Sequence, residues 1–285
     1  MSQSKGYVDS DYLQMAAHLL QGSKRRTYEL MRIQPGQRLL DVGCGPGTDT
    51  IPLAVRVGAG GQVIGVDNNA AMIAEADARA ASAGVSARVK HQQVDVTAGL
   101  PFGDNTFDAC RGERLFQHLS RPEQVLAEMT RVTKPGSWIV VLDTDHGTKS
   151  IDTPEVDIER RLARVAAERC LINGYAGRQL YRLFKRAGLA EISVETISIP
   201  FTDYALCRQA NFLDRVEAEA LAAKVITQAE LQRWHVSLER ADAEGVFFAS
   251  GTGTIVAGRK PEKDSTTKVT KACPERSRRE HKGKP

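Results

Sequence analysis

Glycine and aspartate alternate in one short stretch, RLLDVGCGPGTDT, at residues 38–50 of this 285-residue chain. An apolar run ends at Asp41, and Gly43, Gly45 and Gly47 then follow at every second position before a helical pattern begins. Glycines crowded in this way let a ligand approach the backbone closely. Two phosphate-binding motifs do not fit: the Gly-Lys-Ser/Thr of a P-loop is absent, and the third glycine comes one residue too early for G-x-G-x-x-G.

Two further aspartates close later β-patterned runs. Asp67 ends the second run, 24 residues after Gly43, and Asp95 follows the third. A carboxylate in the position of Asp67 can accept hydrogen bonds from both hydroxyls of a ribose, as it does in dinucleotide-binding folds. An aspartate taken alone is more often a turn or cap residue. Three of them at successive strand ends, beside three glycines, predict a binding site rather than three unrelated turns.

The elements that position these residues alternate between β-rich runs and helical patterns, which is typical of an α/β fold. We expect a Rossmann-like, doubly wound, mostly parallel seven-stranded sheet with helical lid insertions, whose ligands bind beyond the carboxyl ends of the strands. Strands are predicted at 37–42, 62–67, 87–94, 106–111, 137–143, 191–199 and 245–258, and helices at 49–58, 69–84 and 121–136. In the sixth strand the apolar positions change phase between Val194 and Ile197, which predicts a β-bulge.

Three parts are predicted along the chain: an N-terminal helical cap (1–36), a central domain (37–258) and a disordered basic tail (259–285). Helical patterns at about 154–187 and 203–243 are expected to form lids within the central domain. The tail has ten Lys or Arg against four Asp or Glu, and almost no apolar residues. The remaining chain has 29 basic and 31 acidic residues, so the net charge of +4 does not indicate a nucleic-acid partner.

The N-terminus has no apolar signal-peptide core, and the run WIVVL is far shorter than the ~20 residues that cross a bilayer. Five cysteines without a C-x-x-C pair favour reduced thiols over disulfides or a zinc site. We therefore expect a cytoplasmic protein with no metal site and no membrane span. Its oligomeric state stays open, a homodimer included.

The segment LLDVGCGPG resembles the first motif of the class I S-adenosylmethionine-dependent methyltransferases. The chain looks most like the small-molecule enzymes related to ubiquinone/menaquinone-biosynthesis C-methyltransferases, through PFGDNTFDACRGERLFQHL and PEQVLAEMTRVTKPGSWIVV. The likeness runs from about 37 to 143 and continues more weakly to 258. It implies S-adenosyl-L-methionine as cofactor, bound by Asp41, Gly43, Cys44, Gly45, Gly47, Asp67, Asn68, Met72, Asp95, Val96, Arg111 and Gln117.

Methyl transfer is an in-line displacement at an activated sulfonium, so the main task of the protein is to align the reactants. A general base is needed only where the acceptor loses a proton during the attack. Many relatives carry His-His-Leu where this chain has Gln117, His118 and Leu119, so the first histidine is missing. His118 and His146 are the two candidate catalytic residues; the alternatives are a packed histidine and a polar turn. His146 follows the fifth strand with Asp143 and Asp145, without a second cluster that would indicate a metal.

The predicted acceptor is a small molecule. The Asn/Asp-Pro-Pro-aromatic motif of nucleic-acid methyltransferases is absent after the fourth strand, which argues against a nucleic-acid substrate. An apolar lid from Tyr12, Phe212 and Trp234 would favour a hydrophobic or aromatic acceptor, quinone-like or a natural product. One of the basic residues at 24–26 is expected to pair with the carboxylate of the cofactor. The alternative is an enzyme of the same fold that binds the cofactor without net methyl transfer, such as a cyclase or decarboxylase.

Overall fold

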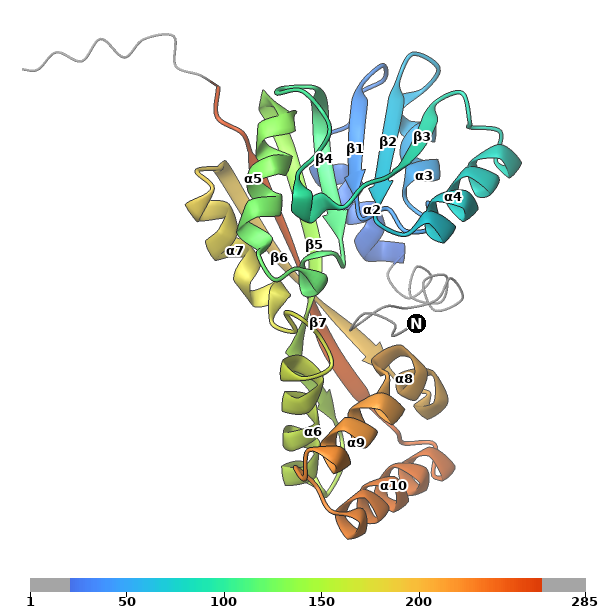
Figure 1. The fold of residues 1–285 in the computed structure, drawn as a ribbon. Coiled ribbons are helices and arrows are strands. Elements are labelled where there is room, and N and C mark those ends of the chain that lie inside the picture. The colour runs from blue at the N-terminus through green and yellow to red at the C-terminus, as the bar shows by residue number, and fades with distance from the viewer. Residues whose placement is uncertain (1–20, 263–285) are drawn as a thin grey trace, which may run out of the picture.

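A seven-stranded sheet organises the computed structural model, which describes residues 21–262. The tail beyond Glu262, residues 1–20 of the expected cap and Tyr12 therefore lie outside the described residues. The strand order is β3 (Val89–Gln93), β2 (Gln62–Asp67), β1 (Arg38–Val42), β4 (Phe107–Glu113), β5 (Thr133–Ile151), β7 (Ala249–Arg259) and β6 (Ala190–Phe201). Neighbours from β3 to β5 pair in parallel, whereas β7 is antiparallel to both β5 and β6. The predicted Rossmann-like, mostly parallel sheet is confirmed (Figure 1).

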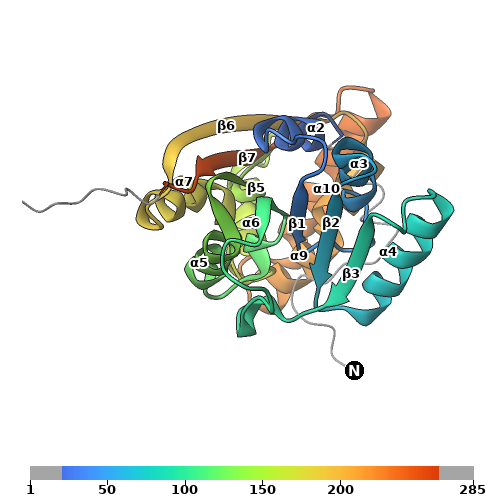
Figure 2. The same ribbon diagram turned by 90° about the horizontal axis from the view of Figure 1, so that it is seen from above.

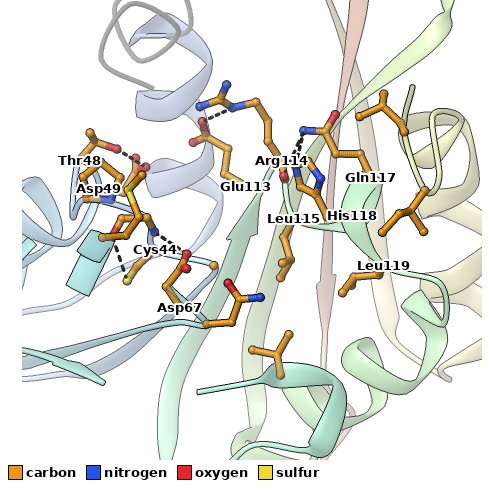
Figure 3. Close-up of a pocket in the computed structure, with 18 of the residues that line it drawn as sticks. Cys44, Thr48, Asp49, Asp67, Glu113, Arg114, Leu115, Gln117, His118 and Leu119 are labelled. Carbon is orange, nitrogen blue, oxygen red and sulfur yellow. Dashed lines mark hydrogen bonds and ion pairs between the residues drawn. The ribbon is translucent and has the colours of Figure 1, made fainter. Parts of the chain in front are cut away.

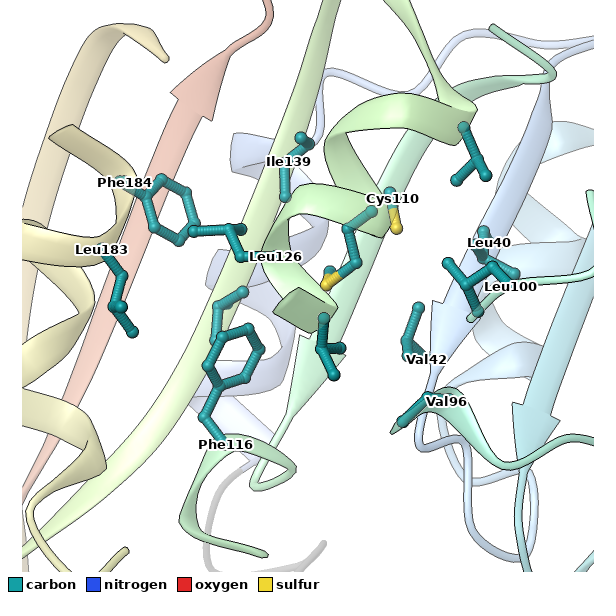
Figure 4. Close-up of a cluster of buried hydrophobic side chains, with 14 of the residues drawn as sticks. Leu40, Val42, Val96, Leu100, Cys110, Phe116, Leu126, Ile139, Leu183 and Phe184 are labelled. Atoms are coloured by element: carbon teal, nitrogen blue, oxygen red, sulfur yellow. The ribbon is translucent and has the colours of Figure 1, made fainter. Parts of the chain in front are cut away.

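Helices cover both faces of this sheet (Figure 2). One face packs against α2 (Gln21–Leu30), α3 (Thr50–Val57) and α4 (Ala70–Ser82), and the other against α5 (Pro122–Val132) and α7 (Ala176–Arg186). Successive residues of a strand point to opposite faces, so Leu39 and Leu40 are both buried but belong to different layers. The layer that holds Leu40 also contains Leu126 and Phe184 (Figure 4). Nearly continuous apolar strands are the expected result of burial on both faces.

The helix α7 is not a lid, although the sequence suggests one over 154–187. Leu180 and Phe184 are fully buried against the sheet beside α5. From this stretch, α6 (Val156–Glu168) belongs to a second lobe, where it packs against the far end of β5. The sequence could not separate the two helices, because α6 and α7 are both amphipathic. An amphipathic pattern does not indicate which part of the protein the apolar face of a helix packs against.

The strands β5, β6 and β7 extend beyond the other four, and a second lobe packs around these extensions (Figure 1). It consists of α6, α8 (Tyr204–Asn211), α9 (Leu213–Ala222) and α10 (Gln228–Ala243) around a core of their own. Trp234 lies in this core, 1% exposed, and donates a hydrogen bond from Nε1 to Glu217 at 3.0 Å. It is therefore a packing residue of the lobe rather than part of a lid. Within residues 21–262, no helix is long and apolar enough to span a membrane.

The bulge predicted between Val194 and Ile197 is wrong. Pairing of β6 with β7 is regular there and shifts instead between Ala190 and Ser193. Ile192 packs on the layer of α5 and α7, whereas Ile197 packs on the opposite layer. The change of apolar phase thus reflects burial on both faces of the sheet, not an extra residue.

Candidate active site

A cavity of about 330 Å³ lies between the carboxyl ends of β1, β2 and β4 and the second lobe. All of the predicted site residues line it except Gly47. Residues that sequence reasoning did not place there are Pro46, Thr48, Asp49, Val94, Thr97, Glu113, Arg114, Leu115, Leu119, Lys149, Ala166, Cys170, Leu171, Ile172, Asn211, Arg215 and Val216. Part of this lining is drawn in Figure 3.

Asp67 holds the glycine loop in place. Its Oδ2 accepts a hydrogen bond from the backbone N–H of Gly45 at 3.0 Å, and its Oδ1 accepts one from Asn69 at 3.0 Å (Figure 3). Gly43 and Gly45 have φ values of 73° and 51°, which glycine adopts without the strain other residues would incur. A carboxylate has about four lone-pair sites, so both oxygens of Asp67 retain capacity for the hydroxyls of a ribose.

Gly47 serves packing instead of ligand contact. Its φ is 76°, and a Cβ there would come within 3.0 Å of the Cβ of Ala76 in α4. The third glycine of the motif therefore allows the loop to approach α4 closely. This role matches the third glycine of dinucleotide motifs, which permits close helix packing.

The predicted adenine side of the cavity is formed by Met72, Asp95 and Val96. Met72 and Val96 are buried, and Asp95 caps the short 3₁₀ helix Val96–Ala98. One carboxylate oxygen of Asp95 accepts hydrogen bonds from the N–H and the hydroxyl of Thr97, at 2.9 and 2.7 Å. These bonds lower the pKa of Asp95, which lines the cavity and whose second oxygen accepts no hydrogen bond from the described residues.

Beneath the loop lies a buried network of two cations and three carboxylates. Nη1 of Arg111 is 3.2 Å from Asp41 and 3.1 Å from Asp49, and its Nη2 is 2.7 Å from Glu113. Lys24 of α2 pairs with Asp49 at 2.5 Å and with Glu113 at 2.9 Å. The guanidinium of Arg111 is thus committed to the protein, which differs from the cofactor contact that the family resemblance implies.

Asp41 lines the cavity and has one oxygen without a partner, whereas the second oxygen of Glu113 is ion-paired with Arg114. The Oδ2 of Asp41 is buried without a hydrogen-bond partner, and the residue is 1% exposed. Burial raises the pKa of Asp41 to about 7, although Arg111 opposes the shift. Arg114, whose Nε lies 3.5 Å from Oε1 of Glu113, adds a third cation, so the charges of the network balance. The ammonium of S-adenosylmethionine fits the orphaned oxygen of Asp41.

Gln117 joins the two candidate histidines. Its Oε1 lies 2.7 Å from Nε2 of His146, and its Nε2 lies 3.3 Å from Nε2 of His118 and donates to the carbonyl of Arg114 at 3.2 Å. With the amide in this orientation, His146 carries its proton on Nε2 and His118 accepts at Nε2. Burial is the main reason that the pKa of His118 falls to about 4 and that of His146 falls well below its usual value. Both histidines are neutral near pH 7.

A four-residue irregularity in β5, residues 146–149, places His146 beside the cavity. Asp145 pairs with Thr252 and Ser150 with Ser250, so residues 146–149 face only Gly251 of β7. The N–H of His146 donates to the carbonyl of Gly174 at 2.8 Å instead of to β7. Bulges of this kind redirect side chains beside functional sites. The bulge also brings Lys149 to the cavity, a residue for which the sequence offered only a polar run after the fifth strand.

Metal ligation finds no support among the acidic residues beside His146. Asp145 is ion-paired with Arg178, and the two oxygens of Asp143 accept hydrogen bonds from the N–H groups of Thr144 and Gln117. Residues 21–262 contain no cluster of three or more His, Cys, Asp or Glu side chains suited to a metal ion. The four cysteines in this range are buried, and no disulfide joins any two of them.

A family model described as a methyltransferase domain matches residues 33–188. The chain belongs to this family. It is 35% identical to an uncharacterized 37.1 kDa protein in a transposon of Streptomyces fradiae, over 78% of this chain and 62% of that protein. It is 36% identical to a demethylmenaquinone methyltransferase of Bacillus pumilus, over 49% of this chain and 60% of that enzyme. The chain spans between 44% and 62% of the length of the curated relatives that it matches.

Solved structures share its fold. A candidate methyltransferase from Bacillus halodurans superposes with a TM-score of 0.62 at 17% identity, covering 85% of this chain and all of that protein. The [4+2]-cyclase SpnF superposes with a TM-score of 0.52 at 23% identity, covering 85% of this chain and 82% of that protein. Other proteins of this fold hold S-adenosylmethionine or S-adenosylhomocysteine. The chain is a class I S-adenosylmethionine-dependent methyltransferase by family, its cofactor is S-adenosylmethionine, and it is related to quinone-biosynthesis enzymes.

Proposed function

We propose that this methyltransferase methylates a small, hydrophobic or aromatic acceptor, quinone-like or a natural product, held between the sheet and the second lobe. The single observation that carries this proposal is the continuity of the cavity. It extends without a break from the glycine loop to the residues of α6, α8 and α9. A donor at one end and an acceptor at the other would meet beside Gln117.

The chemistry of the cavity changes along its length. The cofactor end is polar, with Asp41, Asp67 and Asp95 at the strand ends. The lobe end is lined mainly by the apolar side chains of Leu171, Ile172, Phe212 and Val216. Leu119 adds an apolar side chain beside His118, and Leu115 lies against Gly43 of the glycine loop. Most of the side chains that would contact the acceptor are apolar, so they would pack against an aromatic ring or an alkyl group. Phe212 belongs to this surface, as the sequence predicts for a hydrophobic acceptor.

When bound, S-adenosylmethionine would supply a methyl group on a sulfonium. The leaving group of the in-line displacement would be the thioether of S-adenosylhomocysteine. Asp41 would bind the ammonium of the cofactor's methionine portion, Asp67 its ribose, and Met72, Asp95 and Val96 its adenine. His146 would accept the proton of an acceptor that must lose one, through the lone pair that its bond to Gln117 leaves on Nδ1. Alignment in a water-poor cavity can supply about 7–11 kcal/mol, so the base is a secondary contribution.

The test is incubation of the purified protein with S-adenosylmethionine and a panel of hydroquinones, phenols and polyketide-like aromatics. Release of S-adenosylhomocysteine together with a product 14 mass units heavier supports the proposal. A changed product without S-adenosylhomocysteine would instead indicate the cyclase or decarboxylase chemistry that this fold also hosts. An Asp41→Ala variant, which should not bind the cofactor well, is the control for spontaneous methylation.

A further inference from the structure

The charges that line the cavity are divided between its two ends. All five carboxylates of the lining belong to the cofactor end: Asp41, Asp49, Asp67, Asp95 and Glu113. The lobe end contains two cationic side chains, Lys149 from the bulge of β5 and Arg215 from α9, and no carboxylate. An acceptor in this half of the cavity would face positive charge alone.

Lys149 has no counter-ion within the described part of the chain. No hydrogen bond or ion pair joins its ammonium to any of residues 21–262. The thiols of Cys207 and Cys170 partly oppose the lowering of the pKa of Lys149. Glu159 lines a small adjoining cavity that Lys149 also borders, but its ion pair is with Arg160, at 3.0 Å.

The side chain of Lys149 is half-buried, and loss of hydration without a partner is costly for a cation. It lowers the pKa of Lys149 to about 8. The side chain is nevertheless held in position: its Cγ lies over Gly251, where an added Cβ would be 3.6 Å away. Thr148, the preceding residue, fixes the bulge by accepting a hydrogen bond from the N–H of Thr252 at 3.0 Å. A lysine so placed is positioned for a ligand rather than for packing.

Arg215 faces the same half of the cavity from the other side. It is exposed and makes no ion pair or hydrogen bond with the described residues, whereas its neighbour Asp214 pairs with Arg208. Arg215 and Lys149 come from different elements of the lobe, 66 positions apart in the sequence. Two unpaired cations of separate origin at one end of an otherwise apolar pocket define a site for an anion.

We propose that Lys149, assisted by Arg215, binds an oxyanion of the acceptor, either a carboxylate or an ionised hydroxyl carried on an apolar frame. The inference rests on the proposed function and narrows its substrate class. The anion would compensate the unpaired ammonium of the half-buried Lys149, and it would leave the apolar lining to contact the rest of the molecule. It would also stand close to His146, whose pKa Lys149 depresses in the free protein. A negative group there would make proton uptake by His146 easier.

The experiment compares pairs of probes that differ only in charge: 2-naphthoate with 2-naphthamide, and benzoate with benzamide. Calorimetric titrations are made on the full chain saturated with S-adenosylhomocysteine. Hydrogen bonds to a charged group predict that the anions bind about ten- to a hundredfold more tightly than the amides. Lys149→Met should remove this preference while the amides bind as before, Lys149→Arg should retain most of it, and Arg215→Gln should reduce it.

Lys90→Met replaces an exposed lysine of β3 and is the matched control. Lys149→Met should not lower the melting temperature, because methionine fills similar space without an unpaired, half-buried charge. If no anion binds more tightly than its amide, the inference is overturned. The proposed function is judged separately: a chain that releases S-adenosylhomocysteine with neutral acceptors alone would keep that function and lose the anion site.

Discussion

The amide oxygen of Gln117 lies 2.7 Å from Nε2 of His146, across the cavity edge between the end of β4 and the bulge of β5. This hydrogen bond fixes which ring nitrogen of His146 holds the proton. The amide nitrogen of the same glutamine faces His118 and the carbonyl of Arg114. Where relatives have a histidine, this chain has a residue whose polar groups are all directed at neighbouring protein groups. We therefore assign Gln117 a positioning role.

Replacing Gln117 should change turnover more than cofactor affinity. Gln117→Met keeps the volume but removes both polar groups, so the tautomer of His146 is no longer fixed. General bases contribute about 10²–10⁴-fold, and loss of orientation should cost part of that factor. Steady-state kinetics, with calorimetry on S-adenosylhomocysteine, would separate the two effects. Gln179→Met, which breaks an amide pair with Asn173 outside this cavity, is the control.

Gln117→Glu should change how turnover depends on pH, and so tests the contact between residue 117 and His146. A carboxylate beside His146 favours the imidazolium and raises the pKa of His146 toward the assay range. Turnover of this variant should therefore fall as the pH drops from 8 to 6, whereas wild-type His146 stays neutral throughout because its pKa is depressed. Identical pH–rate profiles for the two proteins would remove His146 from proton transfer.

The raised pKa of Asp41 leads us to predict that the affinity for the cofactor depends on pH. In the free protein the pKa of Asp41 is raised to about 7 by burial, while Arg111, Asp49, Lys24 and Glu113 face it. A bound ammonium favours the carboxylate, so binding releases the proton. Affinity for S-adenosylhomocysteine should be constant above pH 7 and fall by up to about tenfold per pH unit below it.

Calorimetric titrations with S-adenosylhomocysteine between pH 5.5 and 8, in buffers of different ionisation enthalpy, would measure the number of protons released on binding. Asp41→Asn should bind weakly and lose the pH dependence. The comparison is needed because burial also raises the pKa of Asp143 to about 7, and the carboxylate of Asp143 accepts the N–H of Gln117, which lines the cavity. An unchanged pH dependence in Asp41→Asn would assign the proton to Asp143.

Asp67 has a structural task besides the ribose contact. Its two oxygens already accept the N–H groups of Gly45 and Asn69. Asp67→Ala should weaken binding of S-adenosylhomocysteine by about ten- to a few hundredfold, and Asp67→Asn by less, since an amide still accepts one bond. Asp108→Asn is a matched control, because Asp108 accepts the N–H of Arg38 at 2.8 Å outside the cavity. Equal affinity in all variants would reduce Asp67 to a turn residue.

The sequence predicts features whose cause is local. The apolar run before Asp41, the glycines after it and the aspartates that end successive strands are read from neighbouring residues, and their meeting follows from the parallel sheet. The bulge at 146–149 could not be predicted, because it exists only through pairing with β7 about 100 residues later. Lys24 was one of three basic candidates, and its partners Asp49 and Glu113 are 25 and 89 positions away. Amphipathic patterns likewise could not decide that α7 covers the sheet whereas α6 joins the lobe.

The last prediction separates two reasons for a glycine. Gly47 and Gly84 have similar φ values, 76° and 68°, but a Cβ on Gly84 meets nothing within 4 Å. Gly84→Ala should therefore cost only the left-handed backbone, about 1–2 kcal/mol. Gly47→Ala adds contacts at 3.0 Å with Ala76 and 3.1 Å with Thr50, and overpacking of this kind costs about 1–3 kcal/mol more.

The two substitutions should also differ in function. Relief of the contacts at Gly47 would push the loop away from α4 and displace Gly45, which Asp67 holds. Affinity for S-adenosylhomocysteine should then fall several-fold in Gly47→Ala and stay unchanged in Gly84→Ala. Urea unfolding and calorimetry on both variants measure the two effects. Equal losses of stability with equal affinities would mean that only the backbone conformation requires glycine at position 47, and that the loop tolerates a side chain facing α4.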